Sequence, residues 1–325
     1  MSICCSLGCT QRPAAIDHRM TFIRCRRSQV GYAMFEGFSL NYVETDTVTI
    51  RIRIGGRGPP LLLLHGNPQT HVMWHRVASV LSQRFTVVAT DLTGYGMSSK
   101  PPSSADHEPY SKRAMARDQL AVMRKLRHER FMVAGHDRGA RVGYRMALDW
   151  PEAVAKLAVL DIVPTGEAFA RGGKDFALGY YHWFFLAQPA PLPEHIIGAD
   201  PDWFWHWHTT RGPREVFTPE AVKEYLACFR NPETIRAICE DYRAAATIDC
   251  EHDAADKHAG RRIGCPVLVL WGKQGRLQEW YDTLAVWREW AADVRGRALE
   301  CGHYLAEERP EETTVELVSF FTSVS

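Results

Sequence analysis

Several short, uninterrupted apolar runs are the feature that most constrains how this chain can fold. The runs are Pro60–Leu64, Phe85–Ala89, Phe131–Ala134, Leu157–Leu160 and Val267–Trp271. Continuous apolar runs of this length are typical of strands that are covered on both faces, as in parallel sheets. Helix-length segments lie between several of the runs. The alternation therefore predicts an α/β fold with a mostly parallel sheet and helices on both faces.

Residues 47–54 have a different pattern, because polar and apolar side chains alternate along them. A period of two is typical of an edge strand or a half-buried antiparallel strand. The sequence thus predicts one antiparallel strand ahead of the parallel ones.

The regular spacing is interrupted once, by about a hundred residues between Asp161 and Val267 that are rich in Trp, Tyr, Phe, His and Pro. We interpret residues 163–262 as a helical cap inserted above the carboxyl ends of the strands, where it would exclude water from a site beneath it. The core would then comprise residues 34–162 and 263–325.

Residues 1–33 differ from the rest of the chain, with five Arg against one acidic residue, Asp17. One interpretation is a transit peptide, since such segments are rich in Arg and poor in acidic residues. We favour the alternative, which is a disordered leader or a misplaced start, with translation beginning at Met20 or Met34.

Charge and cysteine content limit the partners of the chain. Lys and Arg number 39 against 38 Asp and Glu, so there is no electrostatic case for a nucleic-acid partner. No apolar run approaches the ~18 residues of a membrane span. The nine cysteines are scattered, which favours a reducing, cytoplasmic setting. Cys4, Cys5 and Cys9 could bind a metal, but no histidines accompany them at a fixed spacing, and we expect no metal site.

The segment Gly135-His136-Asp137-Arg138-Gly139 follows one of the predicted strands and leads into a helix-like stretch. This is the pattern of a nucleophile elbow, in which glycines permit a tight, strained turn. The nucleophile would be Asp137 in place of the serine that many hydrolases carry. A carboxylate attacks saturated carbon and forms an ester on the enzyme, so the residue type narrows the reaction class.

His65-Gly66-Asn67-Pro68 directly follows another predicted strand. There the backbone N–H groups of Asn67 and Arg138 can point at one spot, and two such donors form an oxyanion hole. The two motifs together, each directly after a predicted strand, indicate a hydrolase site much more specifically than either motif alone.

An ester on Asp137 must be hydrolysed, and this step needs a base. His303 follows a predicted last strand ending at Glu300 and precedes a helix, which matches the nucleophile, acid, histidine order of the α/β-hydrolase arrangement. The loop after Val267–Trp271 offers no carboxylate, so we assign Asp161, at the end of another strand, as the acid that orients His303.

Arg138 and Arg141 lie on one face of the first turn of the elbow helix. Two buried guanidiniums beside a carboxylate need an anion, and a substrate carboxylate held bidentately would supply it. Ion pairing to Asp149 or Glu152 is the structural alternative.

Several stretches of the chain closely resemble the fluoroacetate dehalogenases. They are Leu61–Trp74, Ala134–Arg145, Lys156–Thr165, Tyr181–Pro193, Cys239–Ala245 and Cys301–Glu308. The resemblance implies an α/β-hydrolase fold with a cap, a homodimer, and no metal or organic cofactor. It also implies that His182, Trp183 and Tyr242 donate hydrogen bonds to the departing halide; an aromatic cap core is the structural alternative for them.

The sequence departs from that family in two places. Asn67 stands where fluoroacetate dehalogenases usually have Phe, and it resembles the halide-binding asparagine of haloalkane dehalogenases, although Arg138 stands where their tryptophan would be. The second departure is residues 203–211, which do not match the fluoroacetate dehalogenases residue by residue. Their His206 and His208 could suggest a metal, but a surface position on the cap is the stronger interpretation.

The sequence therefore predicts hydrolysis of a small anionic 2-haloacid, of the fluoroacetate or chloroacetate type, through an ester on Asp137. An epoxide hydrolase is the nearest alternative, with Tyr242 and either Tyr180 or Tyr181 activating the epoxide oxygen. The arginine pair argues against it, since neutral epoxides give the pair no role. A noncatalytic small-ligand binder on the same fold is the third reading.

Overall fold

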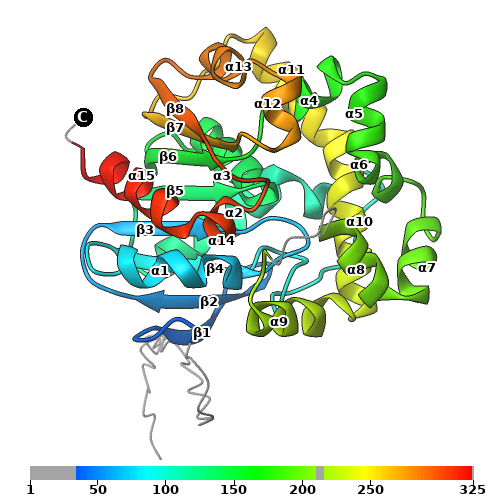
Figure 1. Cartoon of the computed structure of the whole chain (residues 1–325), viewed down its shortest axis with the longest axis horizontal. Coiled ribbons are helices and arrows are strands. Elements are labelled where there is room, and N and C mark those ends of the chain that lie inside the picture. The colour runs from blue at the N-terminus through cyan, green and yellow to red at the C-terminus, as the bar shows by residue number, and fades with distance from the viewer. Residues whose placement is uncertain (1–33, 210–215, 324–325) are drawn as a thin grey trace, which may run out of the picture.

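The computed structural model describes residues 34–209 and 216–323 (Figure 1). The predicted leader, with Cys4, Cys5 and Cys9, lies outside these residues. Among the helices of the described part, none is long and apolar enough to cross a membrane.

A twisted sheet forms the centre of the described chain. Its strands are β1 (Ser39–Glu44), β2 (Thr49–Gly55), β3 (Pro60–Leu64), β4 (Thr86–Thr90), β5 (Phe131–His136), β6 (Val154–Leu160), β7 (Val267–Gly272) and β8 (Val294–Leu299). They lie in the order β1-β2-β4-β3-β5-β6-β7-β8. From β4 to β8 all neighbours pair in parallel, whereas β2 is antiparallel to both β1 and β4. The predicted fold class, a mostly parallel sheet between helices, is confirmed.

The apolar runs form the strands expected of them, and every residue of β5 is buried. The predicted antiparallel strand is β2, which lies second from the edge. The edge strand itself, β1, was not predicted. Its inward-facing positions are Asn41 and Val43, while Tyr42 points outward, so its apolar pattern is out of phase with its burial.

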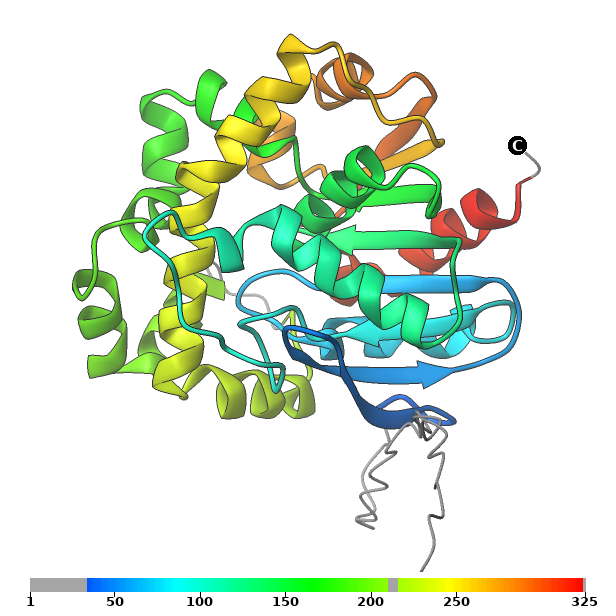
Figure 2. The same ribbon diagram turned by 180° about the vertical axis from the view of Figure 1, so that it is seen from behind.

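Helices cover both faces of the sheet. The helices and single turns that pack around the sheet are η1 (His71–Trp74), α1 (His75–Leu81), η2 (Glu108–Tyr110), α2 (Lys112–Lys125), α3 (Arg138–Asp149), α12 (Arg276–Trp280), α13 (Thr283–Trp290), α14 (Leu305–Glu308) and α15 (Pro310–Thr322). Helices α1 and α15 lie on one face (Figure 1), and α2 and α3 lie on the other (Figure 2).

Between β6 and β7 the chain is helical. These helices are α4 (Thr165–Arg171), α5 (Lys174–Gly179), α6 (Tyr181–Leu186), α7 (Leu192–Ala199), α8 (Pro201–Thr209), α9 (Pro219–Phe229), α10 (Pro232–Ala246) and α11 (Ile248–His258). Local sequence fixes some of their starts, since Thr218 and Asn231 cap α9 and α10 with their side chains ahead of a proline. The helices lie along the end of the sheet toward which the parallel strands point (Figures 1 and 2).

Candidate active site

Asp137 lies at a sharp turn between β5 and α3, as the elbow pattern predicts. Its φ of 47° is in the left-handed region, where a residue with a side chain is strained. The turn is tight enough to require glycine on both sides. A Cβ at Gly135 would lie 2.5 Å from the Gly139 carbonyl oxygen, and one at Gly139 would lie 2.5 Å from that of His65. The fold thus places the Asp137 carboxylate at the end of the strand.

The loop after β3 contacts the Asp137 carboxylate directly. The backbone N–H of Asn67 donates a hydrogen bond to Oδ1 of Asp137 at 2.9 Å. A donor in this position can hold one carboxylate oxygen and later stabilise an oxyanion formed on it. Arg138 begins α3 directly after Asp137, and its backbone N–H remains a predicted second donor.

His303 and Asp161 are 142 positions apart in the sequence but lie in contact. Nδ1 of His303 donates to Oδ2 of Asp161 at 2.5 Å, and Oδ1 of Asp161 accepts from the backbone N–H of Gly272 at 2.8 Å. Because Nδ1 is engaged, Nε2 is the nitrogen left for a water molecule. Asp137, Asp161 and His303 all line one cavity.

Glu308 holds the loop that carries His303, a role that no motif in the sequence indicates. Its two carboxylate oxygens accept from the backbone N–H groups of Gly302 (2.8 Å) and Tyr304 (2.9 Å). The carboxylate therefore holds the peptide on both sides of the histidine.

The charges of the site set the protonation states that the chemistry needs. Burial would raise the pKa of Asp137, but the charges of protonated His303 and of Arg138 outweigh burial and lower it to about 2. Burial would lower the pKa of His303, but the hydrogen bond and charge of Asp161, with the charge of Asp137, raise it above its ordinary value. Asp137 is thus ionised at neutral pH. Esterification would remove the Asp137 charge and with it part of what raises the pKa of His303.

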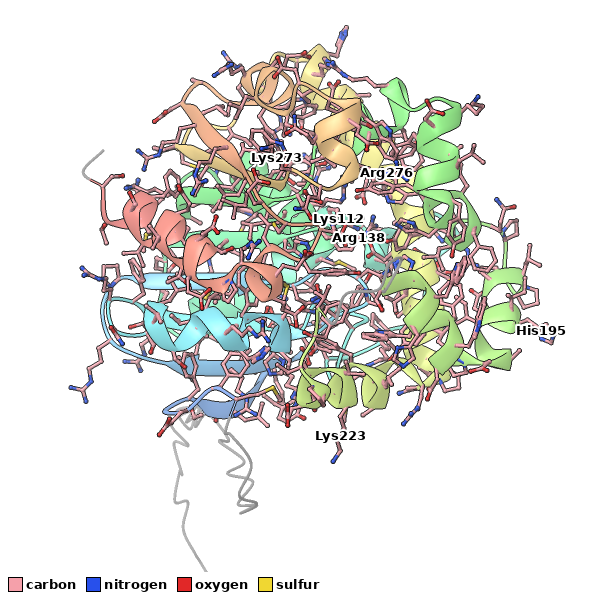
Figure 3. The ribbon with its side chains drawn as sticks, viewed as in Figure 1. Lys112, Arg138, His195, Lys223, Lys273 and Arg276 are labelled. Atoms are coloured by element: carbon pink, nitrogen blue, oxygen red, sulfur yellow. The ribbon has the colours of Figure 1, made fainter. Side chains whose placement is uncertain are left out.

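Arg138 and Lys112 are both buried and lie next to each other in Figure 3. Both side chains donate to the carboxylate of Asp241. Nε and Nη2 of Arg138 donate to the Asp241 carboxylate at 2.8 and 2.6 Å. Nη1 of Arg138 has no hydrogen-bond partner among the described residues. Among the described residues that line the cavity, Arg141 is present but Arg138 is not; the Arg138 guanidinium lies behind Tyr242, with Cζ 4.2 Å from the centroid of that ring.

Arg141 lines the cavity and lies 4.6 Å from the ring centroid of Trp183. Its Nη1 donates to the Val163 carbonyl (3.0 Å) and to Thr165 Oγ1 (3.1 Å), while its buried Nε has no partner within the described chain. The alternative of pairing to Asp149 or Glu152 is wrong for both arginines. Asp149 instead pairs with Arg145 of the same helix and with Arg113.

The three predicted halide ligands lie together above Asp137. His182 and Trp183 come from α6 and Tyr242 from α10; all three are buried and line the cavity, with the ring centroids of His182 and Trp183 at 5.9 and 6.3 Å from that of Tyr242. Burial and the charge of Asp137 raise the pKa of Tyr242, so its hydroxyl keeps its proton. The cavity has a volume of about 560 Å³.

His208 is not on the cap surface, so the surface interpretation is wrong for it. On α8, Phe204, Trp205 and His208 point inward at helical spacing, whereas Trp203 and His206 are exposed. His208 lines the cavity, with Nε2 3.4 Å from Nδ2 of Asn67. In the part of the chain that the structure describes, no three His, Cys, Asp or Glu residues gather as metal ligands do.

Glu307 links the cap to the loop that carries Asn67, and sequence reasoning also missed it. The Tyr225 hydroxyl of α9 donates to its Oε1 at 2.9 Å, and Gln69 Nε2 donates to its Oε2. Burial raises the pKa of Glu307 to about 8, against the lowering effect of those hydrogen bonds. The side chain is therefore largely protonated in the folded protein at neutral pH.

We expect Glu307→Gln to reduce the loss of stability that occurs as the pH rises from 5 to 8. Between the ordinary pKa of 4.5 and about 8, the unfolded chain releases the Glu307 proton and the folded chain keeps it, so the free energy of unfolding falls as pH rises. Each unit of separation is worth about 1.4 kcal/mol, so the variant should lose at least about 1 kcal/mol less than wild type between pH 5 and pH 8. Urea unfolding at both pH values measures this, with exposed Glu311→Gln as control. Equal losses in wild type and Glu307→Gln would contradict it.

Comparison with known proteins shows which family this site belongs to. A family model described as the alpha/beta hydrolase fold matches residues 59–310. The chain belongs to the α/β-hydrolase family. Within it, the chain is 47% identical over 294 residues to a fluoroacetate dehalogenase of Burkholderia sp., which covers 89% of this chain and 95% of that protein. The resemblance read from the sequence motifs is confirmed.

Other members of the family are similar to this α/β hydrolase as well. A soluble epoxide hydrolase of Corynebacterium sp. (strain C12) is 32% identical over 89% of this chain and 96% of its own. Among solved structures, a Nostoc sp. PCC 7120 protein provisionally named an α/β hydrolase has a TM-score of 0.88 and 53% identity over 90% of this chain and 100% of its own. A Pseudomonas aeruginosa protein provisionally named an epoxide hydrolase, solved as a mutant with bound MFA, has a TM-score of 0.84 and 46% identity over 89% and 97%.

Proposed function

We propose that this protein is a hydrolytic dehalogenase that converts a short 2-haloacid, of the fluoroacetate or chloroacetate type, to the 2-hydroxyacid and halide. The observation that carries the proposal is a buried carboxylate nucleophile beside two arginines that each retain a buried donor without a partner in the described chain, Arg138 Nη1 and Arg141 Nε. Buried cationic donors are costly unless an anion meets them. A substrate carboxylate would do so.

In the first step, Oδ2 of Asp137 attacks C2 of the substrate while Oδ1 stays bonded to the Asn67 N–H. A C–O bond forms, the carbon–halogen bond breaks, and the halide leaves with its electron pair. His182, Trp183 and Tyr242 donate to the departing halide. Fluoride is a poor leaving group, so preorganised donors lower the barrier to its departure.

In the second step, Nε2 of His303 takes a proton from water, and the water oxygen attacks the ester carbonyl carbon of Asp137. Asp161 stabilises the imidazolium, and the Asn67 N–H stabilises the oxyanion. The bond between Cγ and Oδ2 of Asp137 then breaks, and the imidazolium of His303 returns its proton to the departing oxygen, which leaves as the hydroxyl of the 2-hydroxyacid. The second proton of the water goes to solvent, and Asp137 is a carboxylate again with one oxygen from the water.

The relatives support the same reading. The Burkholderia protein named as a fluoroacetate dehalogenase shares 47% of residues with this chain, against 32% for the Corynebacterium epoxide hydrolase. Two observations favour an epoxide hydrolase: Tyr180 lines the same cavity as Tyr242, and the Pseudomonas aeruginosa protein that is 46% identical is provisionally named one. Neutral epoxides would leave the free donors of both arginines unmet.

Fluoride, chloride and diol release distinguish the three readings. Purified protein is incubated with fluoroacetate, chloroacetate and styrene oxide. Halide release from the haloacids supports the proposal. Diol without halide indicates an epoxide hydrolase, and no product from any substrate indicates a noncatalytic binder.

We expect Arg141→Lys to weaken binding of the haloacid by about 1.5–3 kcal/mol, seen as a higher KM for chloroacetate. Lysine keeps the charge but loses the planar fork and the Nε donor that faces the substrate. The control is Arg57→Lys at an exposed position. A KM equal to that of wild type would exclude Arg141 from carboxylate binding.

We further propose that the enzyme acts in the cytoplasm as a homodimer. The proposal rests on the near-neutral charge and scattered cysteines and on the resemblance to fluoroacetate dehalogenases. Light scattering on the protein as it elutes from a size-exclusion column measures its molecular mass, and the mass of a monomer would contradict the homodimer.

A further inference from the structure

The Asn67 carboxamide is a polar group at the reaction centre that the two chemical steps do not use. Its side chain lines the cavity and is 5% exposed. Nδ2 lies 3.4 Å from both His208 Nε2 and the Tyr242 hydroxyl, which is long for a hydrogen bond. Oδ1 is buried and has no hydrogen-bond partner among residues 34–209 and 216–323.

The chemistry of the amide indicates what would satisfy it. Rotation of the carboxamide by 180° exchanges its oxygen and nitrogen, so either an acceptor or a donor is left without a partner. A hydroxyl group both donates and accepts, and can therefore meet the remaining atom in either orientation.

His208 extends this polar wall along the cap side of the cavity. Its ring stacks on Phe204 (6.0 Å between centroids, 5° between planes) and meets the ring of His182 edge-on at 4.6 Å. The imidazole is thus held in place beside Asn67 by packing on both sides.

The substituents on the reacting carbon are assigned by elimination. In the proposed function the arginines bind the carboxylate of the 2-haloacid, and His182, Trp183 and Tyr242 bind the halogen. The two remaining substituents on C2 are a hydrogen and C3. C3 and any group on it would therefore lie against the wall formed by Asn67 and His208. The cavity has a volume of about 560 Å³, and pockets of ~300–1,000 Å³ bind molecules much larger than a haloacetate. The site therefore has room for a substituent on C3.

Building on the proposed function, we propose that Asn67 and His208 form a hydroxyl-binding subsite and that the preferred substrates are 2-haloacids with a hydroxyl group on C3. The reaction is the same: the Asp137 oxygen displaces the halide at C2, and water then hydrolyses the ester. The product is a 2,3-dihydroxy acid, and the C3 hydroxyl does not react.

The test compares kcat/KM for 2-chloro-3-hydroxypropanoate and for 2-chlorobutanoate, which has a methyl group in place of the hydroxyl. Wild type should prefer the hydroxylated acid by about tenfold or more, because the apolar analogue leaves the buried amide unmet. Chloride release without enzyme is subtracted for each acid.

Two variants locate the preference. Asn67→Leu keeps the size of the side chain, and His208→Phe keeps a flat ring; each should bring the ratio close to one or below. The control Tyr180→Phe removes a hydroxyl elsewhere in the cavity and should keep the wild-type ratio. If Asn67→Leu does not fold, the ratio measured for His208→Phe decides whether the subsite exists.

Chloroacetate is measured in the same preparations, which separates the two proposals. Turnover of chloroacetate with no preference for the hydroxylated acid would overturn the subsite alone, and so would a preference that survives both variants. No chloride from any of the acids would overturn the dehalogenase function itself.

Discussion

Asp137→Asn is expected to abolish halide release, by on the order of 10⁴-fold or more in kcat, as removal of a covalent nucleophile does in other hydrolases. The amide has the same shape as the carboxylate, so the Asn67 N–H can still bond its oxygen and the strained turn is kept. What is lost is the negative charge that attacks carbon. Chloride release from chloroacetate over hours measures the residual rate.

Two controls show that the loss is chemical. Asp293→Asn makes the same change at an exposed residue beside the amino end of β8, away from the site, and should keep wild-type activity. The thermal unfolding midpoint of Asp137→Asn should stay near that of wild type. A folded Asp137→Asn protein that still releases more than a few per cent of the wild-type halide would rule out Asp137 as the nucleophile.

His303→Ala is expected to release one halide per active site and then stop. Attack by Asp137 needs no base, whereas activation of water does, and a general base is worth about 10²–10⁴-fold. The ester should therefore accumulate. Mass spectrometry after digestion should find the peptide that carries Asp137 heavier by one carboxymethyl group when chloroacetate is the substrate.

The same variant can fail in two distinguishable ways. Steady turnover at the wild-type rate would show that another group activates the water. No initial halide at all, from a protein that still folds, would show that His303 is needed for the first step. Asp161→Asn is the companion variant: it weakens the support of His303 Nδ1 and should slow ester hydrolysis more than ester formation.

The sequence predicted the parts of this molecule in which local pattern and position coincide. Strand β3 is buried except at Pro60 and β5 is buried throughout, and both begin with a continuous apolar run, so they could be predicted directly from the sequence. Asp137 and Asp161 were found because each directly follows such a strand, and carboxyl ends of parallel strands meet at one edge of a sheet. Strand β1 was missed because a polar residue, Asn41, faces inward.

Several features that sequence reasoning missed depend on contacts between residues that are far apart in the sequence. Arg138 pairs with Asp241, 103 positions away, and no local spacing distinguishes this partner from the nearer Asp149. His208 faces the cavity because of the orientation of α8, which its run of aromatic residues does not reveal. Glu307 contacts Gln69, 238 positions away. The position of the cap helices on the core sets the contacts of Arg138 and His208, whereas Glu307 and Gln69 meet within the core.

A single turnover in water enriched in ¹⁸O, with enzyme in excess over chloroacetate, tests the ester on Asp137 most directly. Water attacks the carboxyl carbon of Asp137, so the heavy oxygen should enter the peptide that carries Asp137, and the first glycolate released should be unlabelled. Glycolate that carries the heavy oxygen after one turnover, with none in the protein, would contradict the account.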